Sequence, residues 1–190
     1  MTIVTSSIPG LAYVGDYLGI AEQEQLLATV DGLPWLSDLR RRVQHYGYRY
    51  DYTRKTVDSS LYLGPLPDWA ARLARRLHSD GHIGSVPDQL IVNEYQPGQG
   101  IASHVDCVPC FGDTVLSITL GSACVMTLTE LRERTAVPLL LEPGSLLVMA
   151  GAARYDWKHG IAARKTDTYG GATIVRGRRV SLTFRTMILS

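Results

Sequence analysis

Residues 93–106 read Asn-Glu-Tyr-Gln-Pro-Gly-Gln-Gly-Ile-Ala-Ser-His-Val-Asp. They lie where the chain changes from helical patterns to short strands separated by turns. The stretch ends in His104 and Asp106, an imidazole and a carboxylate two positions apart. Alternate residues of a β-strand point to the same face, so a single strand can present both groups to one metal ion. A second histidine would complete the usual ligand set of non-haem Fe(II) oxygenases, which leaves coordination positions open.

A candidate for that second histidine is His159, in the segment Arg-Tyr-Asp-Trp-Lys-His-Gly at 154–160. An apolar strand is predicted at 145–149, so His159 is expected just beyond a strand end, where a rigid scaffold often positions site residues. A single late histidine is by itself more often a surface or core residue. The remaining histidines are interpreted in that way: His45, His78 and His82.

The C-terminal segment 179–185 alternates strictly between apolar and polar residues, as a half-buried strand does. Its apolar side carries Val180, Leu182 and Phe184, and its polar side carries Arg179, Ser181, Thr183 and Arg185. If the polar side faces the interior, two arginines are buried, which is costly unless an anion compensates them. Arginine binds carboxylates bidentately, so the pair can hold the two ends of a short dicarboxylate. The alternative is the exposed polar face of an edge strand, which needs no ligand.

Strands dominate the second half of the chain. Turn residues separate strands predicted at 89–95, 114–120, 123–128, 138–141, 145–149, 171–175 and 179–188. Helices are predicted at 21–30 and 68–79, and tyrosine at every second position predicts a strand within 40–52. We therefore expect a mainly β protein with flanking helices (α+β), built on a sandwich or barrel of jelly-roll type.

Length and composition bound the class of protein. A chain of 190 residues with a hydrophobic fraction of 45% suits one domain, 1–190. Because the net charge is only +1, any nucleic-acid contact must come from local basic clusters, such as the arginines at 40–42 or those at 72, 75 and 76. We see no signal peptide and no membrane-spanning apolar stretch, and expect a cytoplasmic monomer without a membrane partner. Three cysteines, an odd number, indicate no disulfide framework.

Four motifs, taken together, resemble the AlkB family of Fe(II)- and 2-oxoglutarate-dependent dioxygenases. They are Asn-x-Tyr at 93–95, His-x-Asp at 104–106, His-Gly-Ile at 159–161 and Arg-x-Ser-Leu-Thr-Phe-Arg at 179–185. Segments 93–101 and 145–159, with His-Tyr-Gly-Tyr at 45–48, look most like the subgroup that includes the eukaryotic tRNA wobble-uridine hydroxylase. The resemblance implies a double-stranded β-helix (jelly-roll) core at 89–190. It also implies that 1–88 forms the N-terminal helices and a nucleotide-recognition lid.

The same resemblance assigns roles to individual residues. It implies that His104, Asp106 and His159 bind Fe(II) and form the catalytic centre, with 2-oxoglutarate and O2 as cosubstrates. The residues implied in 2-oxoglutarate binding are Asn93, Tyr95, Arg179, Ser181 and Arg185. Of these, Arg179 would hold the distal carboxylate and Arg185 the carboxylate end nearer the iron, while Ser181 stands where the family often has asparagine. The residues implied in substrate binding are Tyr46, Tyr48, Tyr50 and Arg42; for the tyrosines, packing within a half-buried strand is the alternative.

The segment after Asp106 departs from the bacterial DNA-repair member of the family, in which an acidic residue shortly after His-x-Asp reads the damaged base. Here Cys-Val-Pro-Cys-Phe follows, and the next acid is Asp113. The spacing of Cys107 and Cys110 also fits half a zinc site or a redox pair, but no second Cys-x-x-Cys motif exists. We interpret both cysteines as small loop residues.

The sequence thus predicts an Fe(II)- and 2-oxoglutarate-dependent dioxygenase that oxidises an alkylated or modified base in nucleic acid. DNA, RNA and tRNA all stay open as substrates, as do oxidative demethylation and stable hydroxylation. One alternative keeps the oxygenase chemistry and changes the substrate to a free nucleoside, a peptide or a small metabolite. Another is a non-catalytic binding module that keeps the fold.

Overall fold

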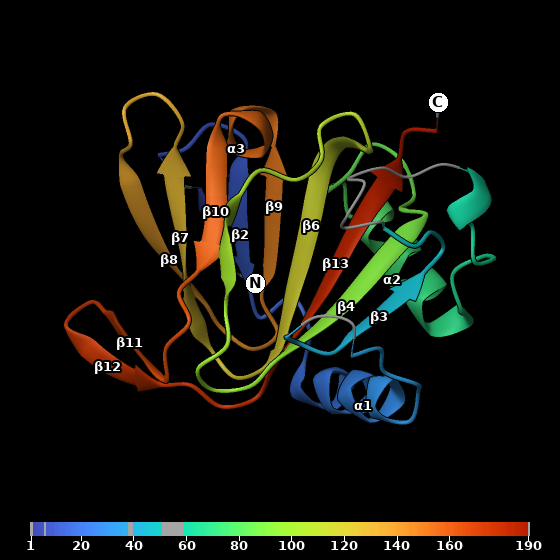
Figure 1. Ribbon diagram of the computed structural model, residues 1–190, viewed down its shortest axis with the longest axis horizontal. Coiled ribbons are helices and arrows are strands. Elements are labelled where there is room, and N and C mark those ends of the chain that lie inside the picture. The colour runs from blue at the N-terminus through green and yellow to red at the C-terminus, as the bar shows by residue number, and fades with distance from the viewer. Residues whose placement is uncertain (1, 6, 38–39, 51–58, 190) are drawn as a thin grey trace.

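Two antiparallel sheets face each other in the computed structural model, which describes residues 2–5, 7–37, 40–50 and 59–189 (Figure 1). The larger sheet consists of β1 (Thr2–Thr5), β2 (Leu11–Gly15), β3 (Val43–Tyr46), β4 (Gln89–Tyr95), β6 (Phe111–Gly121), β9 (Leu146–Ala150) and β13 (Arg179–Met187). The smaller sheet consists of β5 (Ile101–His104), β7 (Cys124–Glu130), β8 (Ala136–Leu141) and β10 (Trp157–Ile161). Their strand orders are β1-β2-β9-β6-β13-β4-β3 and β5-β10-β7-β8. A separate hairpin, β11 (Thr166–Tyr169) and β12 (Ala172–Val175), projects from the left edge in Figure 1.

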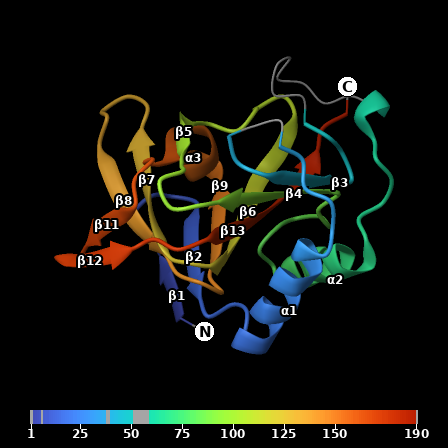
Figure 2. The same cartoon turned by 60° about the horizontal axis from the view of Figure 1, so that its bottom comes forward.

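Helices α1 (Ile20–Asp31) and α2 (Asp68–Ser79) cover one face of the larger sheet (Figure 2). Both confirm the helices predicted from periodicity, α1 within one residue at each end. Their buried leucines pack against the even-numbered side chains of β13, Val180, Leu182 and Phe184, which are all fully buried. A short helix, α3 (Gly151–Tyr155), and a 3-10 turn, η1 (Ser59–Leu61), complete the helical elements of the described residues. None of the described helices is long and apolar enough to cross a membrane.

The opposite face of the larger sheet packs on the smaller sheet. Val115, Leu147 and Met149 meet Met126 and Leu128 there in a second buried cluster. Since side chains alternate along a strand, the odd-numbered residues of β13 point into the space between the sheets. The predicted mainly β jelly-roll with flanking helices is therefore confirmed, and the polar side of β13 faces the interior.

Some local predictions were wrong or incomplete. The strand predicted within 40–52 ends at Tyr46, because Gly47 takes a φ of 77° and passes so close to the Asp88 carbonyl that a Cβ would lie 1.8 Å from its oxygen. Tyr52 lies outside the described residues. Strands β5 and β10, which matter most for the site, were not predicted. The first has only four residues and the second mixes polar residues with a glycine, so neither shows a clean alternation.

Candidate active site

A cavity of about 610 Å³ lies between the two sheets. Strands β4, β6 and β13 supply one wall, and β5 and β10 supply the other. The cavity therefore lies where the odd-numbered side of β13 faces β5 and β10, two neighbouring strands at one edge of the smaller sheet. Residues far apart in the sequence meet here because the sandwich stacks their strands.

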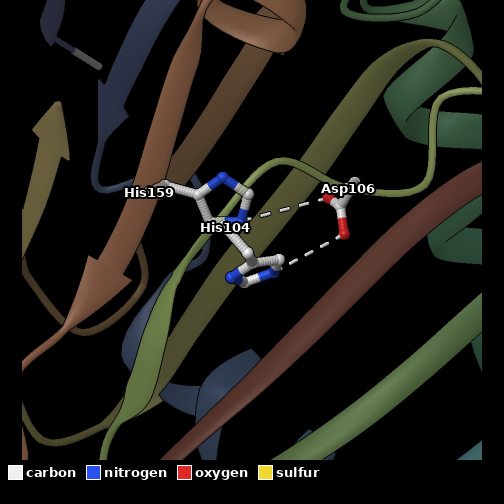
Figure 3. Close-up of side chains that lie close together, drawn as sticks. All are labelled: His104, Asp106 and His159. Atoms are coloured by element: carbon white, nitrogen blue, oxygen red, sulfur yellow. Dashed lines mark ion pairs between the residues drawn. The ribbon is translucent and has the colours of Figure 1, made fainter. Parts of the chain in front are cut away.

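His104, Asp106 and His159 come together in this cavity (Figure 3). One ligand atom from each of the three lies within 4.8 Å of the others. Nε2 of His104 is 3.8 Å from one Asp106 carboxylate oxygen, and Nε2 of His159 is 4.0 Å from the other. The structure thus brings together the three residues expected to bind Fe(II).

The elements that carry these ligands differ from the prediction. His104 ends β5, and Asp106 lies in the loop that follows, so the two do not share one strand. His159 lies within β10 rather than beyond a strand end, and its Cα pairs with that of His104. Nδ1 of His104 is 2.8 Å from the carbonyl oxygen of Ala102, which leaves Nε2 to face the carboxylate.

The electrostatics of the trio suit a divalent cation. Burial lowers the pKa of His159 to about 4, so at neutral pH its imidazole is uncharged and can act as a ligand. Burial alone would raise the pKa of Asp106, but attraction by Arg185, His159 and His104 outweighs this and holds the pKa below its ordinary value. One Asp106 oxygen is buried without a hydrogen-bond partner. A buried carboxylate whose two oxygens each face one imidazole fits metal binding.

Arg154 holds the loop that carries Asp106. This arginine comes from α3, is 3% exposed, and donates hydrogen bonds to the carbonyl oxygens of Asp106 (3.0 Å) and Cys107 (3.2 Å). It therefore fixes the backbone at the carboxylate ligand without touching the carboxylate itself. Sequence reasoning missed Arg154, because an isolated arginine carries no signal of its backbone partners.

A disulfide joins Cys107 and Cys110, directly after Asp106. The expectation that the cysteines form no disulfide was therefore wrong. An odd cysteine count argues against a framework of bridges, but it does not prevent two cysteines in one turn from pairing. Here the turn brings their Cα atoms within 5.3 Å, and the Cys110 amide donates to the Cys107 carbonyl. Cys124 is the free and buried cysteine.

The residues expected to bind 2-oxoglutarate line the same cavity on neighbouring strands. Ser181 pairs with Asn93, and Arg179 pairs with Tyr95, across β13 and β4. Arg179 is 4% exposed and donates to the Thr119 hydroxyl at 2.9 Å, whereas its Nε has no partner. Two of these interior side chains are thus guanidiniums, Arg179 and Arg185, which suits a dianionic ligand.

Arg185 lies beside the ligand trio. Its Nη2 donates to Asp106 at 3.0 Å, and its guanidinium stacks over the Phe111 ring at 4.6 Å. Its buried Nε has no hydrogen-bond partner. Among the odd-numbered residues of β13, Arg185 therefore lies at the end nearer the Asp106 carboxylate, and Arg179 lies at the end farther from it. This is the order that the family resemblance implies.

Arg41 is a further cavity residue that the sequence did not single out. Its Nε donates to the side-chain oxygen of Asn93 at 2.8 Å, and its guanidinium lies 5.7 Å from the centre of the Tyr95 ring. It thus contacts two residues expected to bind 2-oxoglutarate. The arginine run at 40–42 gave a weak signal, but nothing in the run showed which arginine points inward.

The four residues expected to contact substrate are not brought together. Tyr50 lines the cavity and packs on Phe111 with ring centres 5.4 Å apart. Tyr46 instead packs on Trp69 of α2, and Tyr48 packs on Tyr62. Arg42 forms a two-fold ion pair with Glu94 and stacks over Trp35. Only Tyr50 of this set lies in the described cavity wall, and the substrate roles stay predictions.

Comparison with known protein families identifies the family of this chain. Residues 22–185 match the family described as the 2OG-Fe(II) oxygenase superfamily. The chain belongs to this superfamily. The predicted use of Fe(II), 2-oxoglutarate and O2 is the property that defines this family, so that prediction is confirmed at the level of the family.

Similar proteins support the finer prediction. The tRNA (carboxymethyluridine(34)-5-O)-methyltransferase ALKBH8 of Macaca fascicularis is 38% identical over 204 aligned residues, which cover 93% of this chain and 30% of that protein. The alkylated DNA repair protein ALKBH8 homolog of Arabidopsis thaliana is 35% identical over 202 residues, which cover 94% of this chain and 58% of that protein. The chain thus spans less than two thirds of either relative. The predicted resemblance to the AlkB family is confirmed, because these relatives are AlkB-like proteins.

The fold has solved counterparts as well. The structure of OsALKBH1 matches with a TM-score of 0.72 at 17% identity, and the match covers 97% of this chain and 100% of that chain. At this identity the similarity concerns the fold. It agrees with the two-sheet jelly-roll described above.

Proposed function

We propose that this protein is an Fe(II)- and 2-oxoglutarate-dependent dioxygenase that oxidises a modified or alkylated base in nucleic acid. One observation carries the proposal. Two histidines, one carboxylate and two buried arginines line a single cavity in a chain of the oxygenase family. A non-catalytic binding module has no physical need for this complete set.

Different side chains of the cavity bind the metal and the cosubstrate. His104, Asp106 and His159 would hold Fe(II), which together with 2-oxoglutarate supplies an oxidant for C–H bonds from O2. Arg179 binds the distal carboxylate of 2-oxoglutarate as a planar fork, and Arg185 neutralises the carboxylate end nearer the metal. Burial of both arginines keeps water from competing for these contacts.

The charge of the cavity restricts the base it accepts. Among the described lining residues Asp106 is the sole acid, whereas four are arginines, Arg40, Arg41, Arg179 and Arg185. With its carboxylate committed to the metal, the described lining offers no anionic partner to a positively charged methylated base. We therefore propose that neutral or anionic modified bases are preferred. A base in a duplex must leave its stack to enter a cavity between two sheets.

Names of the relatives point to nucleic acid without choosing its kind. One is named for modification of a tRNA uridine and another for repair of alkylated DNA. Because the chain spans 30% of the first relative, the methyltransferase activity in that name is not carried over. The choice between DNA and RNA, and between demethylation and hydroxylation, is left to experiment.

Mass spectrometry of nucleosides tests the substrate class. Bulk tRNA, methylated RNA, methylated DNA and the corresponding free nucleosides are incubated with protein, Fe(II) and 2-oxoglutarate, and then digested and compared. We expect oxidised or demethylated nucleosides from at least one polymer, and none with His159→Ala. If free nucleosides or small acids are oxidised while every polymer is untouched, the proposed substrate class is wrong.

The cellular setting is also part of the proposal. We infer that the chain acts as a monomer in the cytoplasm, without a membrane partner, in keeping with its nearly neutral charge of +1 and mixed composition. Light scattering coupled to size-exclusion chromatography tests the oligomeric state. Fractionation of cells that express the full chain tests the location.

A further inference from the structure

A second groove, of about 800 Å³, lies next to the cavity. It crosses β5, β10 and β7 of the smaller sheet and reaches the segment that precedes β5. Along β7, Met126 and Leu128 point into the core between the sheets, so Thr127 and Thr129 point to the outside. The groove therefore runs over the outer face of the smaller sheet, whereas the cavity lies on its inner face.

The floor of this groove carries glycines where two strands pack closely together. Gly160 of β10 faces outward between Thr127 and Ser103, and a Cβ there would lie 2.8 Å from the Ser103 Cα. A Cβ at Gly100 would likewise lie 2.2 Å from the Ile161 carbonyl oxygen. These glycines allow β5 to lie against β10. As a consequence, the floor of the groove presents backbone groups and the hydroxyls of Ser103, Thr127 and Thr129 beside short apolar side chains.

The groove and the cavity share residues at one end. Arg40, Arg41, Ile101 and Ala102 line both. Arg40 is exposed, and no ion-pair partner for its guanidinium is found in the described part of the chain. Arg41 keeps its Nε on Asn93 inside the cavity. A chain-like substrate whose reacting group occupied the cavity would pass these two arginines and enter the groove.

The charge of the lining selects the kind of substrate. Arg40 and Arg41 are the charged residues among the described lining residues of the groove, and none of those residues is acidic. A cationic end, continuous with the cavity, followed by hydroxyl and backbone groups suits a phosphodiester chain, which presents a regular row of anions.

We propose that this groove binds the sugar–phosphate backbone of a single strand on one side of the base held in the cavity. The inference rests on the proposed function, because it takes nucleic acid as the substrate. Arg40 and Arg41 contact the phosphates nearest the reacting nucleotide, and Thr127 and Thr129 contact the next part of the nucleic-acid strand. The protein therefore binds the nucleotides on one side of the oxidised base as well as the base itself.

Binding measurements with charge variants of the groove floor test the proposal. The probes are a fluorescein-labelled, unmodified single-stranded RNA about ten nucleotides long and the DNA of the same sequence. Thr127→Glu and Thr129→Glu each place a carboxylate on the path of the phosphates, so each is expected to weaken binding about fivefold at low salt. Thr29→Glu is the matched control, because Thr29 is equally half-buried but lies on α1, on the far side of the larger sheet.

A variant of opposite sign guards against a trivial loss of folding. Thr129→Lys adds a cation to the same position and is expected to strengthen binding and to steepen the dependence of affinity on salt by roughly one counterion. If the Glu variants and Thr29→Glu bind the probes alike, or if Thr129→Lys weakens binding, the groove is not the path of the strand. Preference for the RNA or the DNA probe identifies which backbone the groove accepts.

Turnover separates this inference from the proposed function. With a modified oligonucleotide as substrate, Thr127→Glu is expected to raise KM about fivefold and to leave kcat within about twofold. If the KM for the corresponding free nucleoside rises by the same factor, the damage lies in the cavity and the groove assignment fails. If Thr127→Glu oxidises the oligonucleotide as wild type does, the groove assignment fails while the proposed function stands. If the wild-type protein oxidises no polymer, the proposed function fails first.

Discussion

His104 and His159 face each other as paired residues of neighbouring strands, with ring centres 4.4 Å apart. The pairing of β5 with β10 thus sets the distance between two of the three expected metal ligands. Since β5 is an edge strand of four residues, its position depends on close contact with β10. The site is therefore sensitive to the residue that follows His159.

Gly160→Ala is expected to disturb this pairing. The added Cβ would lie 2.8 Å from the Ser103 Cα and 2.9 Å from its amide nitrogen, so the backbone of β5 must shift. We expect a loss of about 1–3 kcal/mol in the free energy of unfolding, measured by urea titration, together with weaker binding of Co(II). Gly84→Ala is the control, because a Cβ there meets nothing within 4 Å. Equal stability of the two variants would contradict the close approach of β5 and β10.

Arg154→Met should weaken metal binding without removing a ligand. The guanidinium holds the carbonyl oxygens of Asp106 and Cys107, so its loss frees the loop that aims the carboxylate. Loss of such an outer partner is expected to lower metal affinity roughly 10- to 100-fold. Calorimetric titration with Mn(II) measures this change. Unchanged affinity in a variant with wild-type circular dichroism would show that the loop holds itself in place.

Arg179→Gln should weaken 2-oxoglutarate binding and spare the metal. Arg179 is buried with an unpartnered Nε, so the variant loses a charge-assisted contact that glutamine cannot replace. We expect the KM for 2-oxoglutarate to rise on the order of 100-fold. The neighbouring Arg178→Gln is the control, because Arg178 pairs with Asp31 and Glu94 outside the cavity. A similar KM in both variants would remove Arg179 from the cosubstrate site.

Glu94 gives a pH-dependent test of the structure around the predicted contact residue Arg42. The hydrogen bonds from Arg42, supported by those from Arg178, outweigh burial and lower the pKa of Glu94 to about 2. The pKa is depressed on folding, so this stabilisation is complete above the ordinary value of 4.5 and is lost as pH falls from 4.5 toward 2. Glu94→Gln should therefore lose roughly 2–3 kcal/mol of unfolding free energy at neutral pH. The difference in unfolding free energy between Glu94→Gln and wild type should vanish as the pH approaches about 2. A difference in unfolding free energy that does not depend on pH would contradict the ion pair.

Substrate charge provides a fifth test. With 2-oxoglutarate bound, Arg179 and Arg185 are paired with its carboxylates, and Arg40 and Arg41 remain as cations of the described lining. A cationic methylated base should therefore bind less well than a neutral one of similar size. We expect kcat/KM to be at least about tenfold lower for N1-methyladenine than for N6-methyladenine in the same oligonucleotide. Arg41→Gln should narrow this gap, because it removes one cation from the cavity wall. A preference for the cationic base would show that its charge is neutralised by a group outside the described lining.

Much of the site was predictable because its signals are local. The alternation in 179–185 fixes which side of β13 carries Arg179 and Arg185, and His104 and Asp106 stand two positions apart in a recognisable motif. Positions 93 and 95 likewise share one side of β4. Each of these signals depends on spacing between residues close together in the chain, which the sequence records directly.

What the sequence missed depends on contacts between distant segments. Arg154 acts through the backbone of a loop 48 residues earlier, and Arg41 acts through Asn93, 52 residues later. Whether Arg42 or Arg41 turns inward is decided by Glu94, which draws Arg42 to the outer face. The Cys107–Cys110 disulfide depends on the geometry of one turn, and a cysteine count cannot reveal it.

The most direct test of the central proposal is parallel measurement of succinate and oxidised nucleoside in one reaction with Fe(II), 2-oxoglutarate and a modified oligonucleotide. A dioxygenase that uses His104, Asp106 and His159 as its metal site should form both products in equal amounts. It should form neither without Fe(II) or in His104→Ala. Oxidised nucleoside that forms without succinate, or that persists in His104→Ala, would contradict the proposed site and its chemistry.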